Sequence, residues 1–496
     1  MEPSLTLDRF CDLATRFAVV PLAVAVLGDI HTPVSVFDQL VGTDEGFLLE
    51  SVEGGERWGR WSFIGWDPAF TVSARNGITT CSDPGVDIPE GDPLEVLESL
   101  IGRYTVPPWD EIGVHVPRPP LHSGAVGYLS YDTVRYIETL PNRPPDDRGL
   151  PEMLWQFVGG LAAFDRLTNS ITLIRNVFVG DDPEADYLEA VRHLDVAIER
   201  LTVSPSIAVG SVLEFDELPE TTQTIERDVF MAVVDRAITE IRDGEVFQVV
   251  PSIRFAAEFN GDTLAVYRAL RIVNPSPYMF LLQSGEVSIA GSSPELMSRV
   301  RDGVVYSRPI AGTRPRGATD EEDRSLEAEL LADPKERAEH VMLIDLARND
   351  LGKVSTFGSV VVDDLMVIER YSHVMHIVSG VSGELVDGIG LVDVLRATFP
   401  HGTVSGAPKV RAMELIDEFE PVARGPYAGA VGYLDFSGNM DTAIALRTCV
   451  MKGSTAWVQA GAGIVVDSDA AREYDECVNK ARAVLAAIAA SRELER

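Results

Sequence analysis

The sequence is poor in cysteine and in positive charge, and each shortage excludes a class of protein. Its four cysteines, Cys11, Cys81, Cys449 and Cys477, show no C-x-x-C spacing, which argues against a zinc site or a disulfide framework and favours a reducing cytoplasm. Lysine and arginine together number 42 against 77 aspartates and glutamates, so the formal net charge is −35. Nucleic acids and anionic membranes require a basic face, and we therefore expect neither as the main partner.

Long apolar runs are scarce as well. One apolar stretch, residues 17–30, is too short to span a bilayer, contains Pro21 and follows a mixture of acidic and basic residues rather than a basic leader. We interpret it as a buried strand or hairpin. With 45% hydrophobic and 24% charged residues, the chain has the composition of a soluble globular protein large enough for one core or two adjoining ones.

The two parts of the chain differ in their patterns. Residues 1–205 contain short strand-like runs separated by turn sequences such as GWDP and ARNG, whereas residues 225–490 mix helices with strands. Helices are expected at about 184–202 and from 226 to Gly244, and the segment between them lacks a sustained period, which indicates a boundary. These patterns predict an α+β fold of packed antiparallel sheets with outer helices.

One hexapeptide, GAVGYL, occurs twice, at residues 124–129 and 429–434. Two identical strand-like segments could record a duplication. Nothing in the sequence around the two copies matches, however, so similar packing needs are the preferred explanation.

Two pairs of glutamates have the spacing of metal ligands on a helix. The stretch 333–352 has the start and stop signals of a helix, and Glu336 and Glu339 share one of its faces. Glu473 and Glu476 have the same spacing near the start of the C-terminal helix. Two such pairs facing each other would form an oxygen-only site suited to Mg²⁺. Because the same spacing recurs elsewhere in this acidic chain, a solvated helix face stays open as the alternative.

Several stretches could contact an anion. Residues 398–416 form a loop of Gly, Thr, Ser and Pro that leads into a helix and offers backbone N–H groups. Gly461 and Gly463 bring the backbone close to a ligand or to another strand. Residues 308–317, RPIAGTRPRG, place three arginines around one threonine. His376 lies in an apolar run, where a satisfied core histidine is the alternative to a catalytic one.

Taken in order, these stretches carry a family resemblance. PIAGTRPRG, AEHVMLIDLARNDLG, HVMHIVSG, FPHGTVSGAPKVRAMELI, GPYAGAVGY, QAGAGIV and EYDECVNKA resemble the chorismate-utilising enzymes, most closely the family of anthranilate synthase component I. The resemblance is dense over residues 225–490. It is thinner before them, where TPVSVFDQL, FLLESVEGGERWGRWSFIG and GAVGYLSYD carry it.

The resemblance implies a reaction and assigns different functions to the two parts of the chain. Chorismate would be aminated at C2 by ammonia, with loss of the C4 hydroxyl and of pyruvate, to give anthranilate, the first step of tryptophan biosynthesis. Residues 1–205 would form a regulatory half and residues 225–490 a chorismate-binding half. Mg²⁺ is the implied cofactor, with Glu339 and Glu476 as direct ligands and with Glu336 and Glu473 assisting through water.

The resemblance also assigns residues to the substrate. Glu295 would be the general acid for departure of the hydroxyl, with His376 and Thr403 beside it. Gln248 stands where relatives that add water carry a lysine base. Ala311 stands where aminodeoxychorismate synthases read PIKGT and attack the ring with that lysine, so direct attack by ammonia is expected. The implied substrate-binding residues are Gly312, Thr313, Tyr427, Arg447, Gly461, Ala462 and Gly463.

The ammonia source and the regulation would involve other molecules. None of the four cysteines lies in the G-x-C-x-G context of a glutaminase, so a separate glutamine amidotransferase subunit, component II, is implied, and with it a hetero-oligomer. By resemblance, Ser51, Pro277, Tyr278 and Met279 would form an allosteric pocket for tryptophan as inhibitor. Trp61 departs from the usual RYSFIG and could alter inhibitor affinity.

Two other functions stay open at this point. An aminodeoxyisochorismate synthase would perform the amination without losing pyruvate. A non-catalytic tryptophan-sensing relative would be expected to have a broken glutamate quartet, but all four glutamates are present. Arg314 and Arg316 could pair with acids of the protein itself, and we assign them no role.

Overall fold

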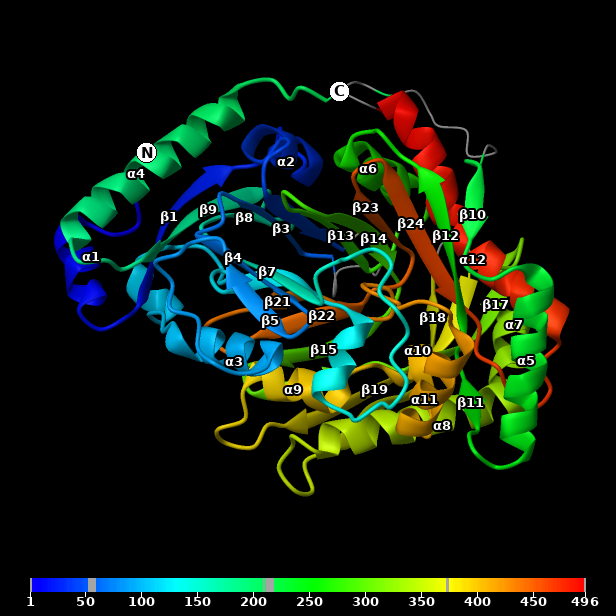
Figure 1. Cartoon of the computed structure of the whole chain (residues 1–496). Coiled ribbons are helices and arrows are strands. Elements are labelled where there is room, and N and C mark those ends of the chain that lie inside the picture. The colour runs from blue at the N-terminus through cyan, green and yellow to red at the C-terminus, as the bar shows by residue number, and fades with distance from the viewer. Residues whose placement is uncertain (1, 52–58, 208–209, 211–217, 372–373, 495–496) are drawn as a thin grey trace.

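The computed structural model describes residues 2–51, 59–207, 210, 218–371 and 374–494, and its body consists of two large antiparallel sheets with helices outside them (Figure 1). The predicted α+β class is therefore confirmed. In the order in which the strands pair, the first sheet contains β1 (Val19–Leu27), β9 (Ser170–Phe178), β8 (Gly160–Asp165), β3 (Trp61–Trp66), β2 (Gly46–Glu50), β13 (Tyr278–Gln283), β14 (Ser288–Ser293), β23 (Thr448–Lys452), β24 (Thr455–Gly461), β12 (Ser252–Glu258) and β10 (Thr221–Gln223).

The second sheet, like the first, carries loops that form the site described below. Its strands, in pairing order, are β17 (Ile310–Pro315), β19 (Val374–Glu384), β16 (Val304–Ser307), β15 (Leu296–Arg301), β22 (Met440–Ile444), β21 (Ala430–Leu434), β6 (Ala125–Leu129), β7 (Met153–Phe157), β4 (Phe70–Arg75) and β5 (Ile78–Cys81), and β18 (Val361–Arg370) also pairs with β19. A separate short ladder joins β11 (Gln248–Val249) to β20 (Gly406–Ala407).

Helices cover the outer faces of both sheets. In Figure 1, α2, α4, α6 and α12 lie against the first sheet, whereas α3, α8 and α9 lie against the second. The helices are α1 (Leu7–Ala14), α2 (Pro33–Leu40), α3 (Pro93–Arg103), α4 (Pro183–Thr202), α5 (Arg227–Arg242), α6 (Thr263–Val273), α7 (Asp320–Ala332), α8 (Pro334–Gly352), α9 (Leu391–Thr398), α10 (Gly402–Ser405), α11 (Lys409–Phe419) and α12 (Ala470–Ala490).

Local signals in the sequence explain several of these elements. The apolar stretch 17–30 contains β1, whose first six residues are buried, so its interpretation as a buried strand is confirmed. Helix α8 begins after Asp333, whose carboxylate accepts from the N–H groups of Lys335 and Glu336, and Pro334 occupies its first position. Of the expected boundary between the halves, residues 208–209 and 211–217 lie outside the described residues.

The two halves of the chain repeat one topology. In the first sheet the N-terminal order β1-β9-β8-β3-β2 is mirrored by β12-β24-β23-β14-β13 on the other side of the centre. In the second sheet β5-β4-β7-β6 is mirrored by β16-β15-β22-β21. Each sheet is therefore made of strands from both halves, which meet at β2–β13 and at β6–β21.

The repeated hexapeptides lie at one of these meeting points. Strands β6 and β21 pair with each other, with Gly127 opposite Gly432 at the centre. In the first sheet Leu48 lies opposite Leu281, and each is the second residue of the similar pentapeptides FLLES and FLLQS. Equivalent positions in a repeated topology favour an internal duplication over the explanation by similar packing needs. The signal was hard to see because only short segments retain the repeat.

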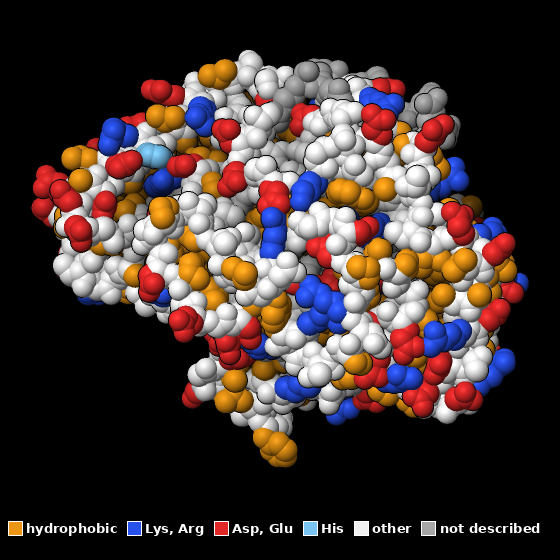
Figure 2. All heavy atoms as spheres, viewed as in Figure 1, with side chains coloured by type: hydrophobic (Ala, Val, Ile, Leu, Met, Phe, Trp, Pro, Cys, Tyr) orange, Lys and Arg blue, Asp and Glu red, His pale blue; other side chains and the backbone are white. Residues whose placement is uncertain are grey.

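The buried clusters contain residues from both halves of the chain, which indicates that the halves form one body. The largest buried cluster takes residues from both halves, including Trp155 and Phe230, and a second cluster also includes residues of both halves, such as Phe47 and Phe280. Acidic side chains are spread over the face shown in Figure 2, with lysines and arginines interspersed. Among the described residues, no helix combines the length and the apolar character that crossing a membrane requires.

Candidate active site

A cavity of about 440 Å³ in the C-terminal half gathers most of the predicted site residues. Its walls come from loops at the strand ends of both sheets and from α8, α10 and α12. The predicted residues that line it are Glu295, Thr313, Glu339, His376, Thr403, Tyr427, Arg447, Gly461 and Gly463.

Other predicted residues lie around this cavity rather than on its wall. Gln248 is buried, and its Nε2 donates to Glu339 Oε1 at 3.4 Å. Gly312 and Ala462 are chain neighbours of lining residues. Glu476 lies in an open hollow of about 490 Å³ that shares Arg447 with the cavity.

Glu295 is the buried acid of the cavity. It follows β14 and is only 4% exposed, and burial raises its pKa to about 7, although a hydrogen bond from Thr403 and the charges of Arg447 and Lys480 act in the opposite direction. Thr403 Oγ1 donates to Glu295 Oε1 at 2.7 Å. A carboxyl group with this pKa keeps its proton up to neutral pH, as a general acid requires.

His376 faces the same cavity from β19. Its Nδ1 lies 3.2 Å from the carbonyl oxygen of Gly312 and 3.0 Å from Thr313 Oγ1. Because a carbonyl oxygen only accepts, Nδ1 carries the proton, and the lone pair is left on Nε2. Burial lowers the pKa of His376, so the ring is neutral at neutral pH and can accept a proton.

A bulge in β17 shapes the wall beside His376. The register with β19 shifts between Ala311 and Thr313, and Gly312 between them has φ +64°, a conformation that favours glycine. A Cβ at Gly312 would also lie 3.2 Å from Glu336 Oε2. Ala311 lines the cavity, and its methyl side chain carries no reactive atom.

The four glutamates come from two helices, α8 and α12, that both contribute to the cavity wall. The pKa of Glu339, on α8, is raised by burial and by the charges of Glu336 and of Glu476 on α12. The pKa of Glu473 is raised by burial and by Glu476. The two pairs are therefore close enough to repel one another.

Cations of the protein take up part of this negative charge. Arg314 donates to Glu336 at 3.3 Å, and Lys480 forms an ion pair with Glu476 at 2.7 Å. Within the described part of the chain, no three acidic, histidine or cysteine side chains already converge on one point as a metal cluster. The donors are nevertheless carboxylate oxygens that repel one another, and such a set fits a hard divalent cation such as Mg²⁺.

Cationic side chains also line the cavity, close to the glutamates. Arg447 precedes β23 with φ +46°, in the left-handed region that costs a non-glycine residue about 1–3 kcal/mol. Burial lowers its pKa, and Glu295 opposes that effect. Lys480 Nζ donates to the carbonyl of Gly461 at 3.0 Å. These cations suit a carboxylate, which a guanidinium and backbone amides can bind together.

Comparison with known proteins agrees with this geometry. The chain matches the chorismate binding enzyme family over residues 45–486. Anthranilate synthase component 1 of Acetivibrio thermocellus is 46% identical over 490 residues, which cover 97% of this chain and 98% of that protein. The chain belongs to the anthranilate synthase component I family. The component of Mycolicibacterium smegmatis is 48% identical over 497 residues, covering 98% of this chain and 93% of that protein.

A solved structure supports the assignment. Anthranilate synthase component I from Streptococcus pneumoniae superposes with a TM-score of 0.77 at 35% identity, covering 93% of this chain and 99% of that one. The chain therefore has the fold and the enzymatic activity of an anthranilate synthase.

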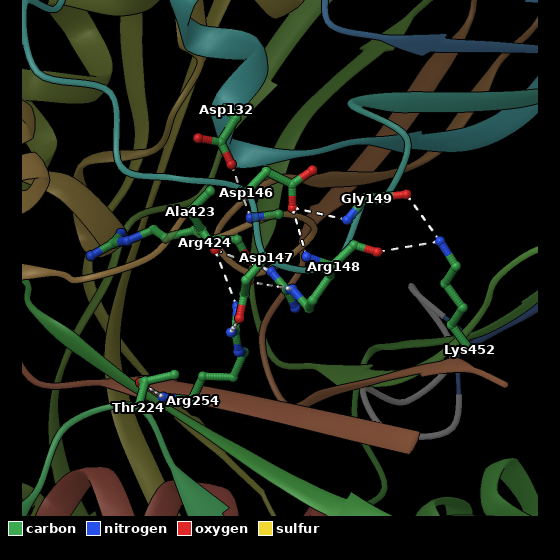
Figure 3. A network of polar contacts seen from close by, with 11 residues as sticks. Asp132, Asp146, Asp147, Arg148, Gly149, Thr224, Arg254, Ala423, Arg424 and Lys452 are labelled. Atoms are coloured by element: carbon green, nitrogen blue, oxygen red, sulfur yellow. Dashed lines mark hydrogen bonds and ion pairs between the residues drawn. The ribbon is translucent and has the colours of Figure 1, made fainter. Parts of the chain in front are cut away.

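A buried network connects the two halves of this anthranilate synthase component I chain behind the cavity (Figure 3). Arg148, from the N-terminal half, donates to the carbonyl oxygens of Ala423 and Arg424 at 3.2 and 2.7 Å. The guanidinium of Arg424 in turn donates to the carbonyl oxygens of Val404 and Val250 at 2.8 and 2.6 Å. Both valines line the cavity, so the N-terminal half supports its wall.

A second cavity, of about 840 Å³, lies between strands of both halves. All four residues predicted for tryptophan line it, namely Ser51, Pro277, Tyr278 and Met279. It shares Pro277, Pro294, Ile310 and Tyr371 with the active-site cavity. The ring of Tyr371 also packs edge-on against His376, with 5.6 Å between the centroids. The two cavities are thus separated by a single layer of side chains.

The sequence analysis assigned no role to Arg314 and Arg316 of RPIAGTRPRG. It also missed some residues that line the cavity. Arg314 pairs with Glu329, Asp333 and Glu336, and Arg316 forms a two-point contact with Asp323. Acids of α7 and α8 therefore hold these two arginines. Lys480, Asn274 and Gln459 also line the cavity. Only Lys480 carried a signal, its position one helical turn after Glu476.

Proposed function

We propose that the chain combines chorismate with ammonia at C2 to give anthranilate, pyruvate and water, with Mg²⁺ as cofactor and tryptophan as feedback inhibitor. The observation that carries this proposal is that a protonated Glu295 and a neutral His376 face one cavity, which a carboxylate cluster and a buried arginine also line. Chorismate has two carboxylates, and a metal held by the cluster and the arginine could hold one each.

Substrate binding would use these two groups of side chains differently. Arg447, Tyr427 and the backbone amides of residues 461–463 would bind the enolpyruvyl carboxylate. Glu339 and Glu476 would hold Mg²⁺, with Glu336 and Glu473 assisting through water. The metal, when bound, would supply a Lewis acid for the ring carboxylate.

The chain's own groups then move the protons. Glu295 donates its proton to the C4 oxygen as that C–O bond breaks and water leaves, while ammonia forms the new bond at C2. His376 Nε2 removes the proton from C2 as the C–O bond to the enolpyruvyl group breaks. The enolpyruvate that departs becomes pyruvate, and the ring becomes aromatic.

Two residues support ammonia as the nucleophile. Gln248 places an amide, not an amine, beside Glu339, so the position offers no base to activate water. Ala311 lines the cavity, and its methyl side chain cannot attack the ring.

Ammonia would reach this site from a partner. All four cysteines lie within the described residues, and none of them lines the cavity. We therefore propose that a glutamine amidotransferase, component II, binds this chain in a hetero-oligomer and supplies ammonia.

Tryptophan would bind in the larger cavity between the halves. Ser51 comes from the end of β2 in one half, whereas Tyr278 and Met279 lie on β13 in the other. A ligand that contacts both could change their relative position and, through the shared side chains, the active site.

The test is to incubate the purified chain with chorismate, Mg²⁺ and a high concentration of ammonium near neutral pH, where Glu295 still holds its proton, and to follow anthranilate fluorescence. Glu295→Gln should reduce turnover about 10²- to 10⁴-fold, because it removes the proton donor. Glutamine should not replace ammonium until component II is added. Chromatography of the product distinguishes this activity from that of an aminodeoxyisochorismate synthase. An aminated product that retains the enolpyruvyl group as the final product would assign the chain to aminodeoxyisochorismate synthesis.

A further inference from the structure

An open hollow of about 490 Å³ lies beside the active-site cavity, and some of its side chains have no role in the mechanism above. Asn274, Arg447 and Lys480 line both spaces, so the hollow and the cavity meet at these side chains. Arg472 and Asn479, two exposed residues of α12, line only the hollow. The hollow is therefore a candidate path from the surface of the molecule to the active site.

The two acids of the hollow are both paired with basic side chains. Asp475 lies 3.2 Å from Arg227 of α5. Glu476 forms its ion pair with Lys480 at 2.7 Å. Because these two pairs add no net charge, the charge of the hollow is decided by its remaining side chains.

The remaining side chains are two guanidinium groups and amides. Arg472 is exposed in the outer part, and Arg447 lies where the hollow meets the cavity. Neither guanidinium forms an ion pair with an acid of the described residues; the charge of Glu295 reaches Arg447, but burial keeps that acid protonated up to neutral pH. The buried Nδ2 of Asn274 has no hydrogen-bond partner in the same part of the chain. The hollow thus offers unpaired positive charge and N–H donors to an anion.

Such a surplus of positive charge matters in this particular chain. Chorismate carries two carboxylates, and the formal net charge of the protein is −35. The overall field therefore repels the substrate. A hollow with unpaired cations raises the local concentration of an anion and the rate at which it associates.

We propose that this hollow is an entrance through which chorismate reaches the active site, and that Arg472 attracts the dianion before Arg447 binds it. Arg472 acts on the approach of the substrate and not on the reaction, since it does not line the cavity. The inference rests on the proposed binding of chorismate in this cavity, and it is independent of the product that is formed.

The first experiment removes the charge of Arg472 and measures association by stopped-flow protein fluorescence, with Mg²⁺ but without ammonium, so that bound chorismate is not consumed. In Arg472→Gln the association rate constant should fall about threefold at low salt, and kcat in the complete assay should not change. Arg472→Lys keeps the charge and should behave as the parent. Arg192→Gln, an exposed residue of α4 on the other side of the molecule (Figure 1), makes the same change in net charge and should also behave as the parent.

Salt separates long-range attraction from direct contact. The screening length falls from about 10 Å at 0.1 M salt to about 3 Å at 1 M. The difference between Arg472→Gln and the parent should therefore disappear at about 1 M salt. A difference that persists there would show that Arg472 contacts bound chorismate, and it would overturn the role in attraction.

A second variant tests the path without changing a charge. Asn479→Trp narrows the hollow, and an obstructed path slows entry and exit alike. Both the association and the dissociation rate constants should fall at least about threefold, whereas Kd and kcat stay unchanged. Asn479→Ala widens the hollow and should behave as the parent.

The outcomes separate this inference from the proposed function. Equal association rates in Arg472→Gln and the parent would overturn the attraction by Arg472, and parent-like rates in Asn479→Trp would overturn the entrance. A final product that keeps the enolpyruvyl group would overturn the proposed function. It would leave the association rates, and with them the inference, as they stand.

Discussion

At the scale of single residues, the site depends on close approaches that only small side chains permit. A Cβ at Gly461 would lie 2.7 Å from the carbonyl oxygen of Pro251 and 2.8 Å from the hydroxyl of Tyr427. A Cβ at Gly463 would lie 2.6 Å from Nε2 of Gln248. These glycines let the backbone after β24 lie against the cavity, where the N–H of Ala462 donates to the carbonyl oxygen of Pro251 at 3.2 Å.

Gly461→Ala should therefore damage both the fold and the binding of chorismate. Backbone near Pro251 cannot give way as a flexible side chain can, so we expect a loss of about 1–3 kcal/mol in the free energy of unfolding. We also expect a higher KM for chorismate. Denaturant unfolding and steady-state kinetics measure the two effects. Gly102→Ala, in α3, is the matched control, since a Cβ there meets nothing within 4 Å. Unchanged stability and KM in Gly461→Ala would show that this contact is not limiting.

Residues of the site were predictable where a local motif carries them. Glu295, Thr403 and Gly461 lie in recognisable stretches, and the cavity brings them together. Lys480 and Arg472 were not predicted, because their importance comes from their place in the fold. Nothing in the sequence near residue 472 indicates that the hollow it lines meets the cavity at Arg447.

At the scale of elements, α8 and α12 bring like charges together. Each helix places two glutamates one turn apart, and Glu339 and Glu473 both have raised pKa values because of burial and neighbouring carboxylates. Repulsion between these carboxylates destabilises the metal-free protein locally, and a bound cation would relieve that repulsion.

Adding Mg²⁺ should consequently raise the Tm of the protein, because a ligand that binds only the folded state stabilises it by mass action. Glu339→Gln should raise the Tm of the metal-free protein, since one crowded carboxylate is removed, and should reduce the response to Mg²⁺. Glu189→Gln, on the exposed side of α4, is the control and should behave as the parent. Differential scanning fluorimetry with and without EDTA measures both shifts. A full Mg²⁺ response in Glu339→Gln would remove that residue from the ligand set.

Element boundaries were predictable where capping residues mark them. Helix α8 was predicted because Asp333, Pro334 and Gly352 mark its ends. The end of β24 at Gly461 is not marked in this way, because it is set by the following residues, which leave the sheet to line the cavity. Sheet order was not predictable, since strands from distant parts of the chain meet at β2–β13 and β6–β21.

At the scale of the whole molecule, the repeated halves differ at equivalent places. The last residue of β24, Gly461, pairs with Ser252, and its counterpart at the end of β9, Phe178, pairs with Val19. Phe178 packs edge-on against Tyr104, with 4.9 Å between the centroids. Both halves contain the motif G-x-x-P-x, as GWDPA at residues 65–69 and as GSSPE at residues 291–295. In this motif Glu295 corresponds to Ala69. The N-terminal half therefore fills with aromatic rings the place where the C-terminal half has its cavity.

Ser51→Phe tests whether the larger cavity regulates the smaller one. The added ring would occupy the space beside Tyr278 and Met279, so tryptophan should inhibit at least about tenfold more weakly while most activity remains, as expected for a separate, coupled site. Inhibition curves at several chorismate concentrations measure the effect. Ser51→Thr keeps the hydroxyl and should remain sensitive. Parent-like inhibition of Ser51→Phe would place the tryptophan site elsewhere.

The central pairings also predict that neither half folds alone. Separating the halves would expose the edges of β2 and β6 on one side and of β13 and β21 on the other, and long unpaired edges promote aggregation. The full chain should unfold in one calorimetric transition whose calorimetric and van't Hoff enthalpies agree. Residues 1–205 or 225–490 expressed singly should be insoluble, whereas co-expression should recover a complex, because each half supplies the other's missing strands. A soluble monomeric half with native-like circular dichroism would show that the shared sheets are not required.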